Sequence, residues 1–326
     1  MEIRRALVTG SAGFIGSHLC ERLVADGTEV RALCRYTSRR ELGNLAHLPS
    51  DTLGAIDVHF GDLLDADFVR TLVRGVDAVF HLGASISVPY SYVAPREVVN
   101  TNVQGTLNVL TAAADAEISR VVHMSSSEVY GTAQYSPIDE EHPLHAQSPY
   151  AASKVGADKL AETFHLSFGL PVVIARPFNT FGPRQSLRAV IPTIIAQAIA
   201  GPLVRIGSTV PTRDFVYVED NVDALIRLAR TDGHDGETFN ISSGVDVSVG
   251  KVVELVGELL GRELVVEQDE RRLRPSKSEV FRLIGSAAKL EAATGWSPTT
   301  DLREGLRAVL SWLEAQPPPN ASAYAI

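Results

Sequence analysis

Short hydrophobic runs alternate with longer amphipathic stretches over most of the chain. Seven runs rich in β-branched and other apolar residues read as strands: RALVTG, EVRALCR, DVHFGD, DAVFHLGA, RVVHMSSS, PVVIARP and ETFNISS. The stretches between them have helical periodicity, as in residues 103–116, where Val103, Leu107, Leu110 and Ala114 fall on one helical face. This alternation predicts right-handed βαβ units and an α/β fold, a doubly wound parallel sheet with helices on both faces.

The alternation weakens after the segment RPFNTFGPRQ (176–185), where Gly, Pro and Arg become frequent. We therefore expect a second, smaller C-terminal α/β lobe. The pattern assigns residues 1–178 and about 215–244 to the sheet domain, and residues 179–214 and about 245–315 to the lobe. An amphipathic helix is expected within VSVGKVVELVGELLGR, and the proline-rich residues 316–326 are expected to form a flexible tail.

Composition narrows the classes of function. The 326 residues carry a net charge of -9, which argues against a nucleic-acid partner, and 45% of them are hydrophobic, which is typical of a globular protein. The longest apolar stretch (189–201) is too short to span a bilayer, so we expect no membrane partner. Two cysteines and no export signal favour a cytoplasmic location. Three histidines lack metal-ligand spacing, so no metal is assigned: His81, His123 and His142.

A glycine-rich turn follows the first expected strand and opens a helix. TGSAGFIGSHL (9–19) places glycines in the spacing GxxGxxG, which permits a tight turn and leaves helix N–H groups free for a pyrophosphate. The alternative is a simple loop, but the flanking strand and helix favour a Rossmann-type dinucleotide site. We assign to the cofactor the residues Gly10, Ala12, Gly13, Phe14, Ile15 and Gly16.

The end of the second strand bears on the choice between NAD and NADP. An acidic residue there would bind the ribose 2′-hydroxyl, but this position is Cys34, followed by Arg35, Thr37 and Ser38. Guanidinium and hydroxyl groups suit a 2′-phosphate, so NADP is favoured over NAD; the alternative is a solvated basic turn. Asp62 is placed to bind adenine, although an Asp after Gly is also common in turns. Leu63, Leu82 and Ala84 complete the expected cofactor contacts.

The segment SPYAASK (148–154) sets Tyr150 four residues before Lys154. On a helix these positions share a face, so the ammonium can lie near the phenol or near a cofactor ribose. A phenol has a pKa near 10, and a base active near pH 7 needs a shift of roughly 3 units. We expect Lys154 and an oxidised nicotinamide to supply this shift; the alternative is a packed aromatic residue.

Three serines and a glutamate follow the fifth strand in HMSSSEVYG (123–131). Strand ends at the carboxyl edge of a parallel sheet face the ligand crevice. We therefore assign Ser126, Ser127 and Glu128, with Tyr150 and Lys154, to the chemical site. Glu128 has a clear use as a base, although it could instead cap the next segment, and the serines could form a turn.

Arginines gather in the segments that link the two expected domains. Such side chains grip a diphosphate with paired hydrogen bonds, and structural salt bridges are the alternative. Arg176 and Arg282 are further candidates of this kind. We assign to the substrate the residues Ser87, Asn179, Arg184, Arg213 and Arg274.

With these motifs in order, the chain resembles an extended short-chain dehydrogenase/reductase that modifies nucleotide sugars, from residue 3 to about residue 315. SSSEVYG, SPYAASK and RPFNTFGPRQ are most similar to the sugar-nucleotide 4,6-dehydratases of the legionaminic-pathway type, acting on nucleotide-linked N-acetylglucosamine, and of the GDP-mannose type. The resemblance implies a nucleotide-diphosphate sugar as substrate, a tightly bound, recycled NAD(P), and a homodimer formed through residues 103–116 and 151–168.

The resemblance also implies roles for the site residues. Tyr150 would take the proton of the C4 hydroxyl, which Ser126 holds, and Glu128 would remove the C5 proton before water leaves C6. The product would be a 4-keto-6-deoxy sugar. Many dTDP-glucose dehydratases have Asp before this Glu, whereas this chain has Ser127, so Glu128 would serve as both base and acid unless the reaction differs.

Three other functions stay open at this point. A UDP-glucuronate decarboxylase shares the glutamate at the strand end, but its usual Arg before the tyrosine segment is replaced here by Ser148 and Pro149. A C4 epimerase is possible, although Glu128 would then have no task. An NAD(P)-sensing regulator without activity is a non-enzymatic alternative, but such proteins typically lose the Tyr or the Lys, and both are present.

Overall fold

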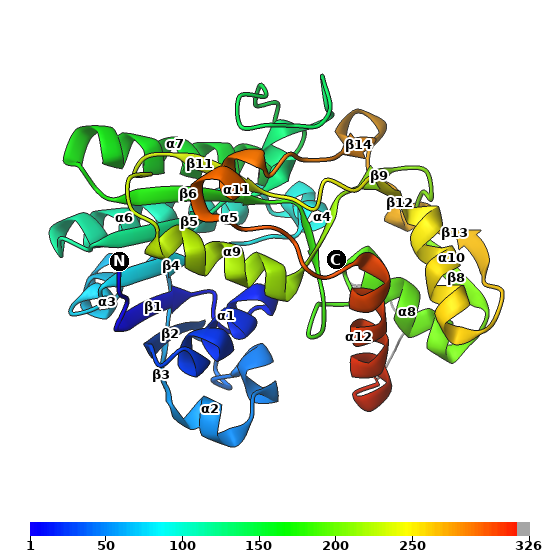
Figure 1. Cartoon of the computed structure of the whole chain (residues 1–326), viewed down its shortest axis with the longest axis horizontal. Helices are drawn as coiled ribbons and strands as arrows, with labels where there is room; N and C mark the ends of the chain where they lie inside the picture. The colour runs from blue at the N-terminus through cyan, green and yellow to red at the C-terminus, as the bar shows by residue number, and fades with distance from the viewer. Residues whose placement is uncertain (318–326) are drawn as a thin grey trace.

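The computed structural model describes residues 1–317, apart from the side chain of Ser276. The expected tail therefore lies outside the described residues from position 318 onward. A seven-stranded parallel sheet has the order β11-β6-β5-β4-β1-β2-β3 (Figure 1). Its strands are β1 (Arg5–Thr9), β2 (Glu29–Arg35), β3 (Ile56–Gly61), β4 (Ala78–His81), β5 (Arg120–Met124), β6 (Val172–Pro177) and β11 (Thr238–Ile241). All seven predicted runs form these strands, and the predicted doubly wound fold is confirmed.

Helices cover both faces of the sheet because successive strand residues point to opposite sides. Leu7 and Val79 pack under one helical layer, and Val8 and Phe80 pack under the other. The first layer contains α3 (Ala66–Val73), α6 (Gly105–Asp115) and α7 (Pro149–Phe168). The second contains α1 (Phe14–Ala25), α2 (Ser50–Gly54), α9 (Val218–Arg230) and α11 (Ala288–Thr294).

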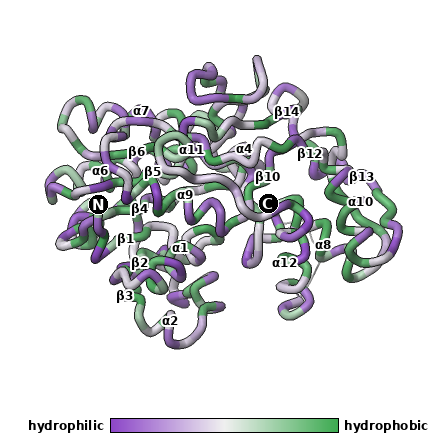
Figure 2. The backbone as a smooth tube through the Cα atoms, viewed as in Figure 1, coloured by the Kyte–Doolittle hydropathy of each residue, from purple (hydrophilic) through white to green (hydrophobic). Residues whose placement is uncertain are grey.

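A smaller lobe stands at one side of the sheet and has a hydrophobic core of its own (Figure 1). Figure 2 shows hydrophobic stretches along two of its helices, α8 (Val190–Ala200) and α10 (Val249–Leu260). The predicted amphipathic helix is confirmed in α10, which buries Val252 and Val256. The lobe further contains β8 (Leu203–Ile206), β9 (Thr212–Arg213), β12 (Val247–Ser248), β13 (Val265–Gln268), β14 (Arg282–Leu283) and α12 (Leu302–Ala315).

Short elements join the two parts at the carboxyl edge of the sheet. The parallel pair β7 (Asn179–Phe181) and β10 (Phe215–Tyr217) lies where the chain passes between the sheet and the lobe. Other short elements are α4 (Val88–Val93), α5 (Pro95–Val99) and the 3-10 turns Gly43–His47, Ser127–Tyr130, Glu270–Arg272 and Ser276–Ser278. Among residues 1–317, no helix has both the length and the apolar character needed to cross a membrane.

The expected helix over 103–116 differs from the prediction at its start. Residues Asn100–Gln104 form a π turn, and α6 begins only at Gly105. Val103 lies in this turn, whereas Leu107, Leu110 and Ala114 share one face of α6, where Leu110 is fully buried and the other two are half-buried against the same hydrophobic core. The expected apolar face is therefore present within α6, and only its first residue falls in the π turn.

Candidate active site

The glycine turn between β1 and α1 has the geometry of a phosphate cradle. Gly10 adopts a positive φ of 71°, and a Cβ there would lie 2.8 Å from the backbone nitrogen of Gly83. A Cβ on Gly16 would collide with the carbonyl of Gly10. Gly13 is the N-cap residue of α1 and has no side chain to accept a hydrogen bond. No capping side chain therefore occupies the N–H groups of the first turn. These residues fit the pyrophosphate of a dinucleotide.

The predicted 2′-phosphate residues lie at the exposed end of β2. Cys34 is buried beside Ser11, while Arg35 is mostly exposed and its nearest carboxylate, that of Glu97, is 3.7 Å away. The hydroxyl of Thr37 is buried and has no hydrogen-bond partner within the described residues, and Ser38 is exposed. The buried Thr37 hydroxyl is therefore able to bond to a ligand at this edge, while Arg35 is exposed and only loosely paired with Glu97.

The remaining predicted cofactor positions line the neighbouring strand ends. The carboxylate of Asp62 accepts a hydrogen bond from the backbone N–H of Leu64 at 2.9 Å, a bond that stabilises a turn. The side chain of Leu63 packs beside Gly105 and Gly83. Leu82 and Ala84 flank Gly83 at the end of β4. Ser87, which we assigned to the substrate, caps α4 by accepting a hydrogen bond from the N–H of Tyr90.

Tyr150 lies in the first turn of α7, which begins because the hydroxyl of Ser148 caps the N–H of Ala151. The phenol is buried next to Val88 and Val98, and the side chain of Ser126 is near enough to act on its pKa. Burial raises the pKa of Tyr150 to about 12, and the nearby Ser126 side chain acts in the opposite direction. In this state the phenol holds its proton firmly.

Lys154 lies one helical turn after Tyr150, on the same helix α7. Its ammonium donates to the backbone carbonyl of Met124 at 2.7 Å. Burial lowers the pKa of Lys154 to about 8, while the charge of Asp158 acts in the opposite direction. The ammonium is therefore fixed at the end of β5, and its effect on the phenol beside an oxidised nicotinamide stays a prediction.

Ser126, Ser127 and Glu128 form the turn that follows β5. The hydroxyl of Ser126 accepts from the N–H of Glu128, and the side chain of Ser127 is buried. The carboxylate of Glu128 is 14% exposed and near enough to Tyr150 to raise the pKa of the phenol further. The structure thus brings the predicted hydroxyl, carboxylate and phenol together at one strand end.

Next to these residues lies a set of buried charges around Asp158, which sequence reasoning missed. It includes Arg176, which we considered for the diphosphate but which the structure buries in an ion pair with Asp158. We call Ser125, His123, Asp158 and Arg176 the sheet-side cluster. Asp158 accepts from Ser125 at 2.8 Å and from two nitrogens of Arg176 at 3.1 and 3.0 Å, and its other oxygen is 3.3 Å from His123. Burial opposes the ionisation of Asp158, but His123, Arg176 and Ser125 together hold its pKa below the ordinary value. The signal in the sequence was a carboxylate four residues after Lys154, on a face that otherwise carries alanines.

Above Glu128 lies a second set of charges from the lobe. We call Glu128, Arg274, Arg213 and Glu279 the lobe-side cluster. Arg274 donates to both oxygens of Glu128, each at 3.2 Å, and Arg213 lies 3.4 Å from Glu279. Two of the predicted substrate residues therefore adjoin the predicted base.

The other predicted substrate residues lie apart from this cluster. Arg184 forms an ion pair with Glu21 of α1 and donates to Ser17, so it ties the loop after β7 to the first helix. Arg282 pairs with Asp246 on the surface. Asn179 begins β7, and its side-chain oxygen is buried with no partner within the described residues, which leaves it able to accept a hydrogen bond from a ligand.

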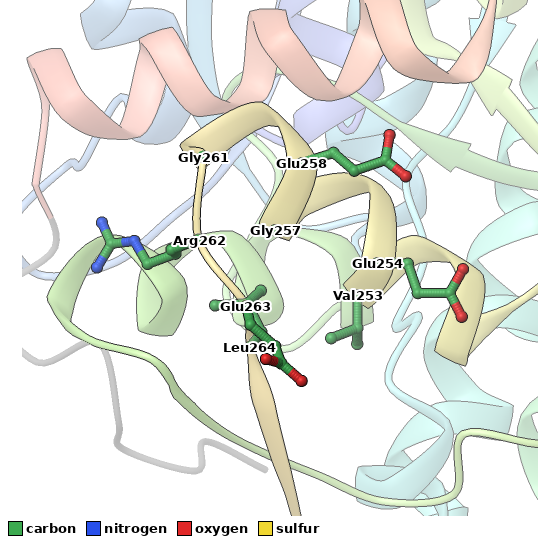
Figure 3. Close-up of a pocket in the computed structure, with 8 residues that line it drawn as sticks. All are labelled: Val253, Glu254, Gly257, Glu258, Gly261, Arg262, Glu263 and Leu264. Carbon is green, nitrogen blue, oxygen red and sulfur yellow. The ribbon is translucent and has the colours of Figure 1, made fainter.

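A hollow of about 620 Å³ lies on the lobe between the end of α10 and the residues that follow it. Figure 3 shows Arg262 pointing away from Glu254 and Glu258. Both glutamates have partners elsewhere, Lys251 for Glu254 and Arg303 for Glu258. The hollow is separate from the cluster around Tyr150, and we assign it no role in the chemistry.

Comparison with known proteins identifies the family of this chain. Residues 7–309 match the model of the family described as GDP-mannose 4,6 dehydratase. The low-salt glycan biosynthesis protein Agl12 of Haloferax volcanii is 36% identical, over 94% of this chain and 97% of that protein. A dTDP-glucose 4,6-dehydratase of Streptomyces griseus is 34% identical, over 94% and 93% of the two chains.

Solved structures give the same result. DesIV, a dTDP-glucose 4,6-dehydratase from Streptomyces venezuelae with NAD bound, has a TM-score of 0.86 and 31% identity, over 96% of this chain and 97% of that one. Proteins with a different stated activity are similar to this chain to the same degree. One is a UDP-glucose 4-epimerase of Mycolicibacterium smegmatis. Another is RMD of Pseudomonas aeruginosa, whose solved structure is complexed with NADPH. The chain belongs to the GDP-mannose 4,6-dehydratase family, among the extended short-chain dehydrogenases/reductases that modify nucleotide sugars with NAD(P).

Proposed function

We propose that this protein is a nucleotide-sugar 4,6-dehydratase acting on a UDP- or GDP-linked hexose or N-acetylhexosamine. The observation that carries the proposal is the grouping of Ser126, Glu128 and Tyr150 at one strand end, beside the glycine turn. An epimerase, which only oxidises and then reduces C4, needs a phenol to take the proton of the C4 hydroxyl and a serine hydroxyl to hold that group. A carboxylate in the same group is suited to remove a second proton, from C5, which elimination of water requires.

The side chains support the following roles. Ser126 would hold the C4 hydroxyl and Tyr150 would take its proton as C4 is oxidised. A bound nicotinamide would supply the place for the C4 hydride until it is returned to C6, and its positive charge when oxidised would favour the phenolate. Glu128 would remove the C5 proton, which the new ketone acidifies, and give it to the C6 hydroxyl, which leaves as water. The proton taken up by Tyr150 would then be available for C5 as the hydride reaches C6. Lys154, fixed by Met124, would hold a cofactor hydroxyl near Tyr150.

Arg35, Thr37 and Ser38 support NADP over NAD as the cofactor. The charged edge of β2 suits a 2′-phosphate, and titration of each cofactor by fluorescence would measure the preference. We expect NADP to bind at least about tenfold more tightly, which corresponds to about 1.4 kcal/mol. A smaller ratio would contradict this part of the proposal.

We further propose a homodimer formed through α6 and α7. Val103 in the π turn and Leu107 and Ala114 in α6 are only half-buried within this chain, so part of their apolar surface is open for a second copy to cover. Light scattering should give twice the mass of one chain, and a monomeric mass over the working concentration range would refute this assembly.

C4 epimerisation is the second candidate function. It is favoured by the paired hydrogen bonds from Arg274 to Glu128, because a carboxylate held in this way is poorly placed to take a proton. UDP-glucuronate decarboxylation and a sensing role without turnover are weaker candidates.

Incubation with a panel of UDP-, GDP- and dTDP-linked sugars separates these functions, with the product analysed by mass spectrometry. Dehydration gives a product lighter by one water, decarboxylation one lighter by carbon dioxide, and epimerisation an isomer. We expect loss of water, and loss of roughly 100- to 10,000-fold in rate for Tyr150→Phe. An isomeric product would assign the protein to the epimerases instead.

A further inference from the structure

The lobe-side cluster contains two arginines and two glutamates, all largely shielded from solvent. The side chains of Arg274 and Glu128 are 23% and 14% exposed, and those of Arg213 and Glu279 are 9% and 16% exposed. Burial lowers the pKa of Arg213, and the charges of Glu128 and Arg274 act on it in opposite directions, so the two pairs form one electrostatic unit. Its formal charge is zero.

A diphosphate would bind unfavourably to these four side chains as they stand. Each guanidinium already faces a carboxylate, and the negative charge of Glu128 would repel the negative charge of the diphosphate. Arg274 donates to Glu128 with both terminal nitrogens, the geometry that a guanidinium also uses for phosphate. One planar group cannot make both sets of paired bonds with the same two nitrogens.

The backbone around Arg274 is irregular and is anchored beyond it. Arg274 lies between two short 3-10 turns, Glu270–Arg272 and Ser276–Ser278. The hydroxyl of Ser278 donates to the carbonyl of Gln147 at 2.5 Å and lies 2.5 Å from the hydroxyl of Tyr92. These bonds hold the segment across the cleft, while the side chain of Arg274 can turn without breaking a helix or strand.

We propose that Glu128 and the diphosphate of the substrate compete for Arg274, so that substrate binding releases Glu128 for proton transfer. This inference rests on the proposed function and adds a positioning role for Arg274. Before binding, the guanidinium occupies both oxygens of the carboxylate. After binding, the guanidinium is drawn to phosphate and the carboxylate faces the sugar. The same competition explains how Glu128 can be engaged in this structure and still serve as a base.

A double-mutant cycle on nucleotide binding tests the competition without any turnover. UDP, GDP and dTDP would be titrated calorimetrically into the cofactor-loaded protein, and the tightest would be used for every variant. We expect Glu128→Gln to bind that nucleotide about tenfold more tightly than the natural chain, because Arg274 is then free; this corresponds to about 1.4 kcal/mol. In the background of Arg274→Met, the same Glu128→Gln change should alter affinity by less than about threefold.

The controls distinguish competition from simple charge repulsion. Glu267→Gln removes an exposed carboxylate of β13 that pairs with Arg205, and should leave affinity unchanged. An equal gain from Glu128→Gln in both backgrounds, or no gain in the natural background, would overturn the competition. If Arg274→Met does not fold, Arg274→Gln serves in its place, since it removes the charge for which Glu128 and phosphate compete but keeps a polar side chain. Failure of all three nucleotides to bind the natural chain would refute the nucleotide-sugar function itself.

Discussion

The two charged clusters on either side of Tyr150 differ in how they are built. In the sheet-side cluster, Asp158, Arg176 and His123 are at most 4% exposed and come from α7, β6 and β5, which pack directly on one another. In the lobe-side cluster, Arg274 and Glu128 are 146 positions apart, and irregular turns supply both. The first set of charges is fixed by secondary structure. In the second, Arg213 and Glu279 also bond to the backbone, but Arg274 and Glu128 are joined through their paired hydrogen bonds, which suits charges that exchange partners with a ligand.

The largest expected effect on stability lies in the sheet-side cluster. Asp158→Ala leaves the guanidinium of Arg176 buried without a counter-ion, so we expect a loss of about 3–5 kcal/mol in the free energy of unfolding. Urea denaturation monitored by circular dichroism measures this loss. Glu267→Gln, at an exposed ion pair, is the matched control and should cost less than about 1 kcal/mol. Equal small losses in both variants would remove the distinction between fixed and exposed charges.

A smaller effect is expected in the lobe-side cluster. Glu279→Gln breaks a pair with a separation of 3.4 Å, and Arg213 can then turn toward Glu128, which already acts on it electrostatically. The expected loss in the free energy of unfolding is about 1–2 kcal/mol, between the values for exposed and fully buried pairs. The same urea titration applies. A loss as large as that of Asp158→Ala would show that the charges of the lobe-side cluster are held as rigidly as those of the sheet-side cluster.

The smallest expected effect comes from buried neutral histidines near the sheet edge. Burial and then the charge of Arg184 lower the pKa of His18 to about 4, and burial, aided by His123 and Lys154, lowers the pKa of His81 well below its ordinary value. In the unfolded chain both would gain protons below about pH 6.5, so their contribution to stability is present above that pH and is lost as the pH falls.

Lowering the pH from 7.5 to 5.5 should therefore cost about 1 kcal/mol for each of these two histidines. Urea titrations at both pH values measure the change, and His18→Gln should reduce it by about 1 kcal/mol. A protein that is more stable at the lower pH would show that these rings are not held neutral in the fold.

The sheet could be predicted from the sequence because each strand carries its own signal. Seven apolar runs separated by helical stretches leave few topologies open, and all seven became strands of one sheet. The π turn at Asn100–Gln104 could not be predicted in the same way, since it has no periodic signature, and it removes Val103 from the regular helix.

The positions of the site residues could be predicted where a local motif determines the geometry. They could not be predicted where the packing of distant segments determines which side chains meet. The hydroxyl, carboxylate and phenol of Ser126, Glu128 and Tyr150 meet because strand ends and helix starts share one edge of a parallel sheet. The bond from Lys154 to the carbonyl of Met124 depends on how α7 packs on β5. The pairing of Glu128 with Arg274 depends on an irregular segment far along the chain, which no local pattern places.

The reaction of Glu128→Gln with an accepted nucleotide sugar tests the central claim most directly. A carboxylate that acts only after oxidation at C4 predicts that this variant accumulates reduced nicotinamide, seen by its absorbance, while the sugar keeps all of its water in mass spectrometry. A product lighter by one water, formed at the rate of the natural chain, would contradict the assignment of Glu128 as the base for dehydration.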